Sequence, residues 1–260
     1  MNTDKEINIF LEGKKIPITF YHPLTQMTEK IYEIFLRLGY SFFESSEIET
    51  EENNFNLLNM PRFHPARTMH DTFYLNDNLL LRTHTTNIQP YLMKKNINKE
   101  LRVITMGKVY RRDNDDPSHT HQFMQFDCFV VEKETKFTHS FAHLKGTIEF
   151  FIKEIFRKKK IRFRPSYFPF TEPSVELDIE CICLKNKKCN ICKGTKWIEI
   201  AGAGLINPYV LKKCGFDNKK FGGYAFAFGI ERLLMIKHRI KDIRDFYLND
   251  IRFLKSIKKV

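Results

Sequence analysis

Two stretches of alternating side chains on either side of a charged loop form the clearest pattern in this chain. Residues 103–110 alternate between two sets of positions, and residues 125–130 do the same. A period of two residues is typical of β-strands. The pattern therefore predicts two strands joined by the loop from Asp113 to His121, with Arg111 at the point where the first strand ends.

Apolar residues at helical spacing predict two helices. Four of them between Ile31 and Leu38 follow an i, i+3, i+4, i+7 pattern, and we expect Thr28 to cap this helix and Gly39 to end it. A second helix is predicted over 138–158. Its expected buried stripe consists of Phe141, Leu144, Ile148, Phe151, Ile152 and Ile155.

Strands are predicted again before and after these helices. One covers 11–20, three more lie between 163 and 206, and residues 224–238 read as a strand that turns into a helix at Gly229. No Pro/Gly/Ser-rich linker divides the 260 residues, of which 42% are hydrophobic. The chain is therefore predicted to be one α/β unit with one large core.

The charge balance favours a polyanionic partner. The 43 Lys and Arg residues outnumber the 31 Asp and Glu residues, which gives a net charge of +12. Such an excess suits RNA, although lysine enrichment is also common in AT-biased genomes. The longest apolar runs are too short for a membrane span, and the polar start MNTDKEIN is unlike a signal peptide. We expect a cytoplasmic protein with reduced cysteines and no membrane contact.

Cations and histidine gather around the loop between the first two predicted strands. Arg111, Arg112, His119 and Gln125 suit a nucleoside triphosphate, because fixed cations neutralise phosphate oxygens during in-line displacement. The alternative is a solvated, charged turn between two core strands. A further arginine, Arg232, stands at the predicted strand-to-helix junction, where an arginine usually forms a surface salt bridge.

Six segments of the chain resemble the catalytic core of the phenylalanyl-tRNA synthetase α subunit, bacterial type. They are PRFHPARTMHDTFYL, LLLRTHTTNIQ, GKVYRRDNDDPSHTHQFMQFD, PSYFPFTEPSVELDI, KWIEIAGAGLINP and YAFAFGIERLLMI. The resemblance runs from about His22 to Leu254, and the segments follow one another in the family's order. It implies a class II aminoacyl-tRNA synthetase catalytic core, an α/β (α+β) fold with a mainly antiparallel sheet flanked by helices.

The resemblance also implies a domain division. A short N-terminal segment would cover residues 1–21, and the catalytic domain would cover 22–260, with a Cys-rich hairpin at 181–192. The helix after Thr28 corresponds to the first class II signature, which builds a dimer interface in the family; its periodicity alone is equally typical of an ordinary core helix. Family members also carry an N-terminal coiled coil that binds tRNA, and from the resemblance we expect this chain to lack it.

The reaction implied by the resemblance is adenylation of phenylalanine followed by transfer to tRNA(Phe). Arg111 matches the arginine that bridges the attacking carboxylate and the α-phosphate, and Arg232 matches the arginine on the other side of the ATP; these two are the expected catalytic residues. Glu231 is a candidate structural partner of Arg232. The expected ATP-binding residues are Arg111, Asp113, His119 and Arg232.

The amino-acid pocket implied by the resemblance joins polar and apolar residues. Phe168 and Phe170 are expected on one face of a strand, holding a benzyl ring edge to face; alternatively they are two core residues of a phenylalanine-rich chain. Ala225 is expected at the floor of the ring pocket. The expected amino-acid-binding residues are His84, Thr86, Gln89, Gln125, Asp127, Phe168, Phe170, Ala225 and Ala227.

The sequence departs from the family pattern at several of these positions. Asp127 stands where glutamate is usual, Thr86 where serine is usual, and Ala227 at the first glycine of the third signature. Met124 and Asn207 stand where the family has histidine. An alternative function is therefore a catalytically weakened or silent paralogue that binds RNA or activates another amino acid. Retention of both arginines favours the enzyme.

Cofactors and partners follow from the resemblance as well. It implies ATP and Mg²⁺, and a β subunit with which the α subunit forms an (αβ)2 heterotetramer.

Four cysteines lie within twelve residues. Cys181, Cys183, Cys189 and Cys192 form the pattern C-x-C-x5-C-x2-C, which indicates tetrahedral zinc. The alternative is four free thiols on an inherited loop. A bound zinc ion would staple the hairpin rather than take part in catalysis.

Overall fold

The computed structural model describes residues 21–68, 72–133, 140–181, 183, 189 and 192–257. The strand predicted over 11–20 and nearly all of the predicted segment 1–21 lie outside the described residues.

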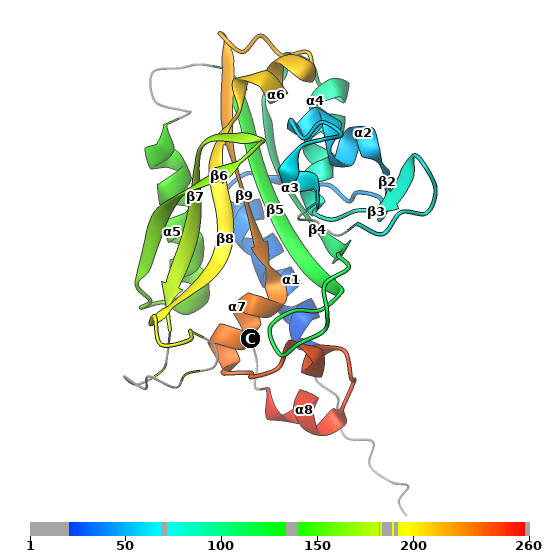
Figure 1. Ribbon diagram of the computed structural model, residues 1–260. Coiled ribbons are helices and arrows are strands. Elements are labelled where there is room, and N and C mark those ends of the chain that lie inside the picture. Colours follow the sequence, from blue (N-terminus) through cyan, green and yellow to red (C-terminus); the bar gives the residue numbers. More distant parts are fainter. Residues whose placement is uncertain are drawn as a thin grey trace, which may run out of the picture.

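A seven-stranded sheet forms the centre of the molecule (Figure 1). Neighbouring strands run antiparallel in the order β1-β4-β5-β9-β8-β7-β6, except that β1 is parallel to β4. The seven strands are β1 (Ser41–Phe42), β4 (Leu101–Tyr110), β5 (Gln122–Lys133), β6 (Ile161–Phe168), β7 (Thr171–Glu180), β8 (Trp197–Ile206) and β9 (Phe221–Gly229). A small separate sheet pairs β2 (Ile48–Thr50) with β3 (Leu79–Leu81). This arrangement confirms the predicted fold class.

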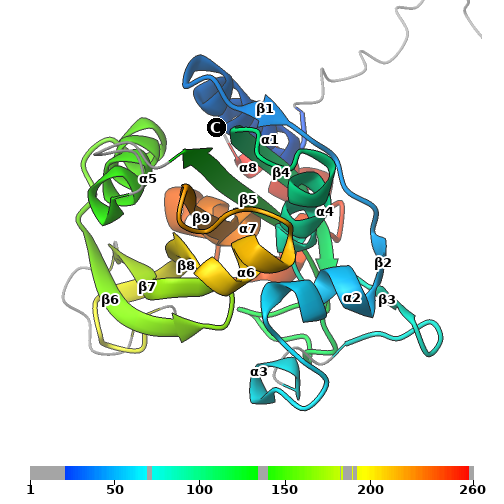
Figure 2. The same cartoon turned by 90° about the horizontal axis from the view of Figure 1, so that it is seen from above.

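Helices cover one face of the large sheet and part of the other (Figures 1 and 2). On the first face, α1 (Pro23–Arg37), α5 (Phe141–Phe156) and α7 (Ile230–His238) share one apolar core with the strands. On the second face, α4 (Ile88–Lys95) and α6 (Pro208–Lys213) pack over one end of the sheet. The remaining short helices are α2 (Glu51–Asn54), η1 (Asn56–Leu58), α3 (Pro65–Thr68), η2 (Thr85–Asn87), η3 (Ile243–Phe246) and α8 (Ile251–Ser256).

Strand β9 shows how the two faces differ. Its aromatic residues Tyr224, Phe226 and Phe228 are buried in the core beneath α1, α5 and α7. The rings of Phe226 and Phe228 lie 5.8 Å apart, nearly perpendicular to each other. The residues between them, Ala225 and Ala227, face the other way, because successive side chains of a strand point to opposite faces. The period of two therefore places large rings in the core and leaves space on the second face.

The first predicted helix is correct in kind and wrong in its start. It begins at Pro23 and not after Thr28, and the side chain of His22 caps it by accepting a hydrogen bond from the Leu24 backbone N–H at 3.2 Å. Proline at the first turn suits a helix start, since its missing N–H would have no partner there. Apolar spacing alone does not reveal this first turn. Besides Pro23, its buried apolar side chains are Leu24 and Met27, too few to establish a helical period.

The other predicted elements agree with the structure to within a few residues. Helix α5 buries the predicted stripe, with Phe141 only half-buried at its start, and β9 passes into α7 at Gly229. Residues 103–106 of β4 are all buried despite their alternation, because helices or neighbouring elements cover both faces there. Among the helices that the structure describes, none combines the length and apolar character needed to cross a lipid bilayer.

Candidate functional site

A cavity of about 700 Å³ opens on the second face of the sheet, where α4 and α6 do not cover it. Its floor is set by strand register: Asp127 of β5 lies opposite Ala227 of β9, which in turn lies opposite Gly202 of β8. The cavity brings together all the residues expected to bind ATP or the amino acid. They are His84, Thr86, Gln89, Arg111, Asp113, His119, Gln125, Asp127, Phe168, Phe170, Ala225, Ala227 and Arg232.

Asp127 is a buried carboxylate held by two neutral donors. Thr86 donates its hydroxyl to one carboxylate oxygen at 2.8 Å, and Gln89 donates its amide N–H to the other at 2.8 Å. Burial raises the pKa of Asp127 to about 6, while the two hydrogen bonds act in the opposite direction. No ion pair between described residues involves Asp127, so its charge is available to a cation that enters the cavity.

Gln125 and His84 lie on the same side of the cavity. The side-chain carbonyl of Gln125 accepts from the Thr85 backbone N–H at 2.8 Å, which fixes the orientation of its amide. His84 is buried between the rings of Phe55 and Phe170, with centroid distances of 6.5 and 6.3 Å. With its carbonyl committed to Thr85, Gln125 has its NH₂ group to offer a ligand.

The two expected catalytic arginines reach the cavity from different elements. Arg111, directly after β4, donates from Nε to the Thr83 carbonyl at 3.1 Å, and its guanidinium lies over the Phe123 ring at 5.2 Å. Arg232, in the first turn of α7, donates from Nη1 to the Glu199 carbonyl at 3.1 Å. Burial lowers the pKa of Arg111, yet an arginine stays cationic at neutral pH. Both cations are anchored by backbone carbonyls. No ion pair among the described residues involves either guanidinium.

Glu231 is not the partner of Arg232. It is buried, and one of its carboxylate oxygens accepts from the Met124 backbone N–H at 2.7 Å and from the Tyr247 hydroxyl. Burial raises the pKa of Glu231 to about 7. Glu231 therefore joins α7 to β5 and to the segment after η3. No local pattern predicts these contacts, because Met124 and Tyr247 are distant from Glu231 in the chain.

The loop after Arg111 is closed by its own acidic residues. His119 contacts Asp116 through Nδ1 at 2.9 Å, and His121 contacts Asp115 through Nδ1 at 2.9 Å. The Ile243 backbone N–H donates to the Pro117 carbonyl at 2.9 Å, which ties the loop to η3. The loop borders the cavity through residues that include His119 and Thr120.

The predicted aromatic pair is present, but in a different geometry. Phe168 ends β6 and Phe170 lies in the turn before β7, so they do not share one face of a strand. Their rings stack on each other, 5.9 Å apart with an interplanar angle of 18°. A Cβ on Gly202 would lie 2.9 Å from the Phe168 ring, so only glycine there lets the ring lie on β8. The pair forms one wall of the cavity.

Two acidic residues of the cavity were missed by the sequence reasoning. Glu176 of β7 and Glu199 of β8 line the cavity. The Nη2 atom of Arg164 lies 2.7 Å from Oε2 of Glu176 and 3.8 Å from Oε2 of Glu199. Burial, and next the charge of Glu176, raise the pKa of Glu199. Carboxylate oxygens are the ligands that Mg²⁺ prefers, so these two residues could hold a metal ion. Both residues alternate with apolar neighbours along their strands, which could have indicated a polar site. The same alternation is typical of strand residues that face solvent.

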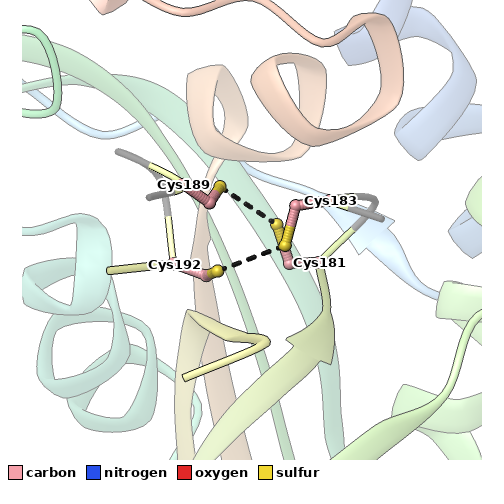
Figure 3. Close-up of side chains that lie close together, drawn as sticks. All are labelled: Cys181, Cys183, Cys189 and Cys192. Carbon is pink, nitrogen blue, oxygen red and sulfur yellow. Dashed lines mark hydrogen bonds between the residues drawn. The ribbon is translucent and has the colours of Figure 1, made fainter. Parts of the chain in front are cut away.

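The four clustered cysteines, drawn in Figure 3, are not among the residues that line the cavity. Their Sγ atoms point toward one another from the two arms of the loop between β7 and β8, and all four lie within 4.8 Å of each other. No disulfide joins any of the six cysteines, all of which are among the described residues. The other two, Cys128 and Cys214, are buried.

Comparisons with known proteins agree on one group of enzymes. Residues 6–257 match the family described as tRNA synthetases class II core domain (F). The chain is 47% identical over 255 residues to the phenylalanine–tRNA ligase alpha subunit of Bacillus mycoides (strain KBAB4), covering 97% of this chain and 73% of that one. The alpha subunit from Bacillus cytotoxicus matches with the same identity and coverage. Among solved structures, a pyrrolysyl tRNA synthetase from Desulfitobacterium hafniense is similar in fold, with a TM-score of 0.63 and 17% identity over 86% of this chain and 72% of that chain.

Proposed function

The chain belongs to the class II tRNA synthetase core family and, within it, to the phenylalanine–tRNA ligase alpha subunits, and from this premise we propose how its cavity works. Members of this family are ligases that use ATP and Mg²⁺ to join an amino acid to tRNA. The carboxylate of phenylalanine attacks the α-phosphorus of ATP, pyrophosphate leaves, and the acyl group then passes to the terminal adenosine of tRNA(Phe). No side chain needs to act as a covalent nucleophile, so catalysis rests on position and charge.

Asp127 receives the ammonium group of phenylalanine in this proposal. Its two oxygens already accept from Thr86 and Gln89, and a cationic N–H can share these oxygens because each has a further lone pair. The shorter side chain, compared with the glutamate usual in the family, brings the ammonium closer to the sheet. The benzyl ring then extends toward Ala225, with the stacked Phe168 and Phe170 beside it.

Arg111 and Arg232 hold the ATP from two sides. Arg111 bridges the attacking carboxylate and the α-phosphate, since a guanidinium donates two parallel hydrogen bonds to such oxygens. Arg232 lies against the nucleotide from α7, while Asp113 and His119 approach from the loop after β4. The observation that carries the proposal is that both arginines face the cavity with no carboxylate partner among the described residues.

Glu176 and Glu199 are the residues that would hold Mg²⁺. Their carboxylates lie at the cavity on neighbouring strands, where they would offer oxygen ligands to a divalent ion that also binds phosphate oxygens. Arg164, which pairs with Glu176, would have to give up part of this contact to the ion. The ion would neutralise charge on the leaving pyrophosphate.

The partners follow from membership of an alpha-subunit family. Such a subunit works with a partner subunit, with tRNA and with an amino acid. We propose an (αβ)2 heterotetramer in the cytoplasm, with tRNA(Phe) bound by both subunits. We infer in addition that the four clustered cysteines hold a structural Zn²⁺, outside the cavity and its chemistry.

A silent paralogue is the less favoured function. Such a protein would have no physical need for two arginines that line one cavity without an ion pair to any carboxylate of the described residues. Asp127 and Ala227, which differ from the family pattern, both lie on the cavity floor. They leave room for a ligand, because aspartate is shorter than the usual glutamate and alanine adds only a methyl group to the usual glycine.

Phenylalanine-dependent exchange of labelled pyrophosphate into ATP tests the proposal, using the chain purified with its partner subunit. We expect exchange that needs phenylalanine and falls about a thousandfold in Arg111→Ala. Arg112→Ala is the matched control, since Arg112 is exposed and does not line the cavity. Absence of exchange in the complete complex, with ATP still bound, would favour the silent paralogue or another amino acid.

A further inference from the structure

The four cysteines stand at the end of the β7–β8 hairpin. Cys181 and Cys183 leave β7, and Cys189 and Cys192 lead back toward β8 (Figure 3). The Cys181 backbone N–H donates to the Lys196 carbonyl at 2.8 Å, which continues the pairing of the two strands. The cluster therefore closes the hairpin at the residue that follows the last β7 residue.

The sulfur positions fit a tetrahedral metal ion. Zn–S bonds of about 2.3 Å place the sulfurs of a tetrahedral site roughly 3.8 Å apart. The Sγ atoms of Cys181 and Cys189 are separated by 3.8 Å, and those of Cys183 and Cys192 by 3.4 Å. Four thiolates complete the coordination and leave no open position, as in structural zinc sites.

Charge in the loop supports a bound thiolate cluster. Zinc with four thiolates carries a net charge of about −2. The sequence from Cys181 to Trp197 contains no acidic residue and contains Lys185, Lys187, Lys188, Lys193 and Lys196. After Cys192 the backbone turns through two left-handed residues, Lys193 (φ 47°) and Gly194 (φ 84°), which reverse the chain toward β8.

A short chain of contacts links the cluster to the cavity. Trp197, the first residue of β8, pairs with Glu180 of β7, and the Arg162 guanidinium lies over its ring at 4.5 Å. Two residues farther along β8, the Glu199 carbonyl accepts the hydrogen bond from Arg232. Among the described residues, this is the hydrogen bond that holds the Arg232 guanidinium, so its anchor lies on the strand that the cluster closes.

We propose that the four cysteines bind one Zn²⁺ and that this ion positions Arg232 for ATP by fixing the start of β8. Without the ion, nothing crosslinks the paired ends of β7 and β8, and the position of the Glu199 carbonyl becomes less fixed. Asp127 lies on β5, anchored by Thr86 and Gln89, and does not depend on this hairpin end. Loss of zinc therefore weakens ATP binding more than phenylalanine binding. This second part rests on the proposed function; the metal site does not.

Metal content tests the site independently of activity. We expect about one zinc per chain in the purified αβ complex, lost in Cys183→Ser and kept in Cys214→Ala, which changes a buried cysteine outside the cluster. Growth with Co²⁺ instead of zinc should give the absorption of a tetrahedral cobalt–thiolate site in the wild-type complex, a readout that needs no variant to fold. Four free thiols without metal, or two disulfides detected by mass, would overturn the site.

Kinetics of pyrophosphate exchange test the positioning role. In zinc-depleted complex that is still folded, we expect the KM for ATP to rise about tenfold while the KM for phenylalanine changes little. Readdition of Zn²⁺ should restore the KM for ATP. An unchanged KM for ATP after complete loss of zinc would overturn the link to Arg232. If the intact complex lacked exchange activity but contained zinc, the proposed function would fail and the metal site would stand.

Discussion

The two faces of the central sheet are built from the same strands and serve opposite purposes. On the core face of β5 and β9, Phe126, Phe226 and Phe228 pack ring against ring beneath the helices. On the cavity face of β9, Ala225 and Ala227 leave space for ligands. One alternating sequence thus encodes both faces. Small side chains on one face of the strand leave space for a ligand, while large rings on the other face fill the core.

Removal of a ring from the core face should give the largest effect. Phe228→Ala is expected to lower the free energy of unfolding by about 3–5 kcal/mol, because it leaves a cavity among Phe126, Phe151 and Phe226. Denaturant unfolding measures this. Folded Phe228→Ala should keep an ordinary KM for phenylalanine. A large rise in that KM without loss of stability would contradict the division between the faces.

Removal of charge from the cavity face should act on binding instead. Asp127→Asn keeps the shape of the side chain but lacks the charge that we assign to the substrate ammonium. We expect affinity for phenylalanine to fall about a hundredfold, or roughly 2.7 kcal/mol. Calorimetric titration measures this affinity. Asp127→Glu serves as the control, because it keeps the negative charge and has the side chain that is usual in the family. Equal affinity in Asp127→Asn would exclude the assigned role.

The buried carboxylates also predict opposite pH trends for stability and binding. The pKa of Asp127 is raised to about 6 and that of Glu231 to about 7, so each favours folding in its protonated form. Their contribution to stability is full below about pH 4 and is lost as the pH rises through 6 to 7, on the order of 3 kcal/mol for each group. Phenylalanine binding needs ionised Asp127 and should weaken as the pH falls through about 6.

Unfolding curves and binding titrations between pH 4 and 8 measure both trends. Asp127→Asn and Glu231→Gln should each flatten the fall in stability over this range. The same slope in both variants and the wild type would show that other groups determine it.

Addition of volume to the cavity floor should give a smaller effect. Ala225→Val is expected to reduce kcat/KM for phenylalanine by about tenfold, or 1.4 kcal/mol, because two added methyl groups occupy ring space. Ala225→Gly is the control and should retain phenylalanine activation. Comparison with smaller amino acids sharpens the test, since only the bulky ring should be penalised. Unchanged phenylalanine kinetics in Ala225→Val would place the ring elsewhere in the cavity.

Local sequence patterns were sufficient for some parts of this molecule. The alternation around 103–130 predicted the strand that ends just before Arg111 and the strand that carries Asp127. The spacing of four cysteines within twelve residues predicted a cluster that the structure shows. These succeed because the interacting residues are close in the chain, or because one strand repeats one periodicity. The start of α1 was missed, since a His-Pro cap has no apolar period.

The sequence by itself determined which residue types lie on each strand, where the arginines stand, and, through the six ordered segments, which family the chain belongs to. Only the tertiary structure decided that Asp127, Ala227 and Gly202 lie in one row across β5, β9 and β8. It also decided that Arg232 donates to the Glu199 carbonyl instead of pairing with Glu231, and that Phe168 stacks on Phe170. The physical reason is that these contacts depend on the register of strands and helices far apart in the chain. Packing of the whole core sets that register, and no local pattern records it.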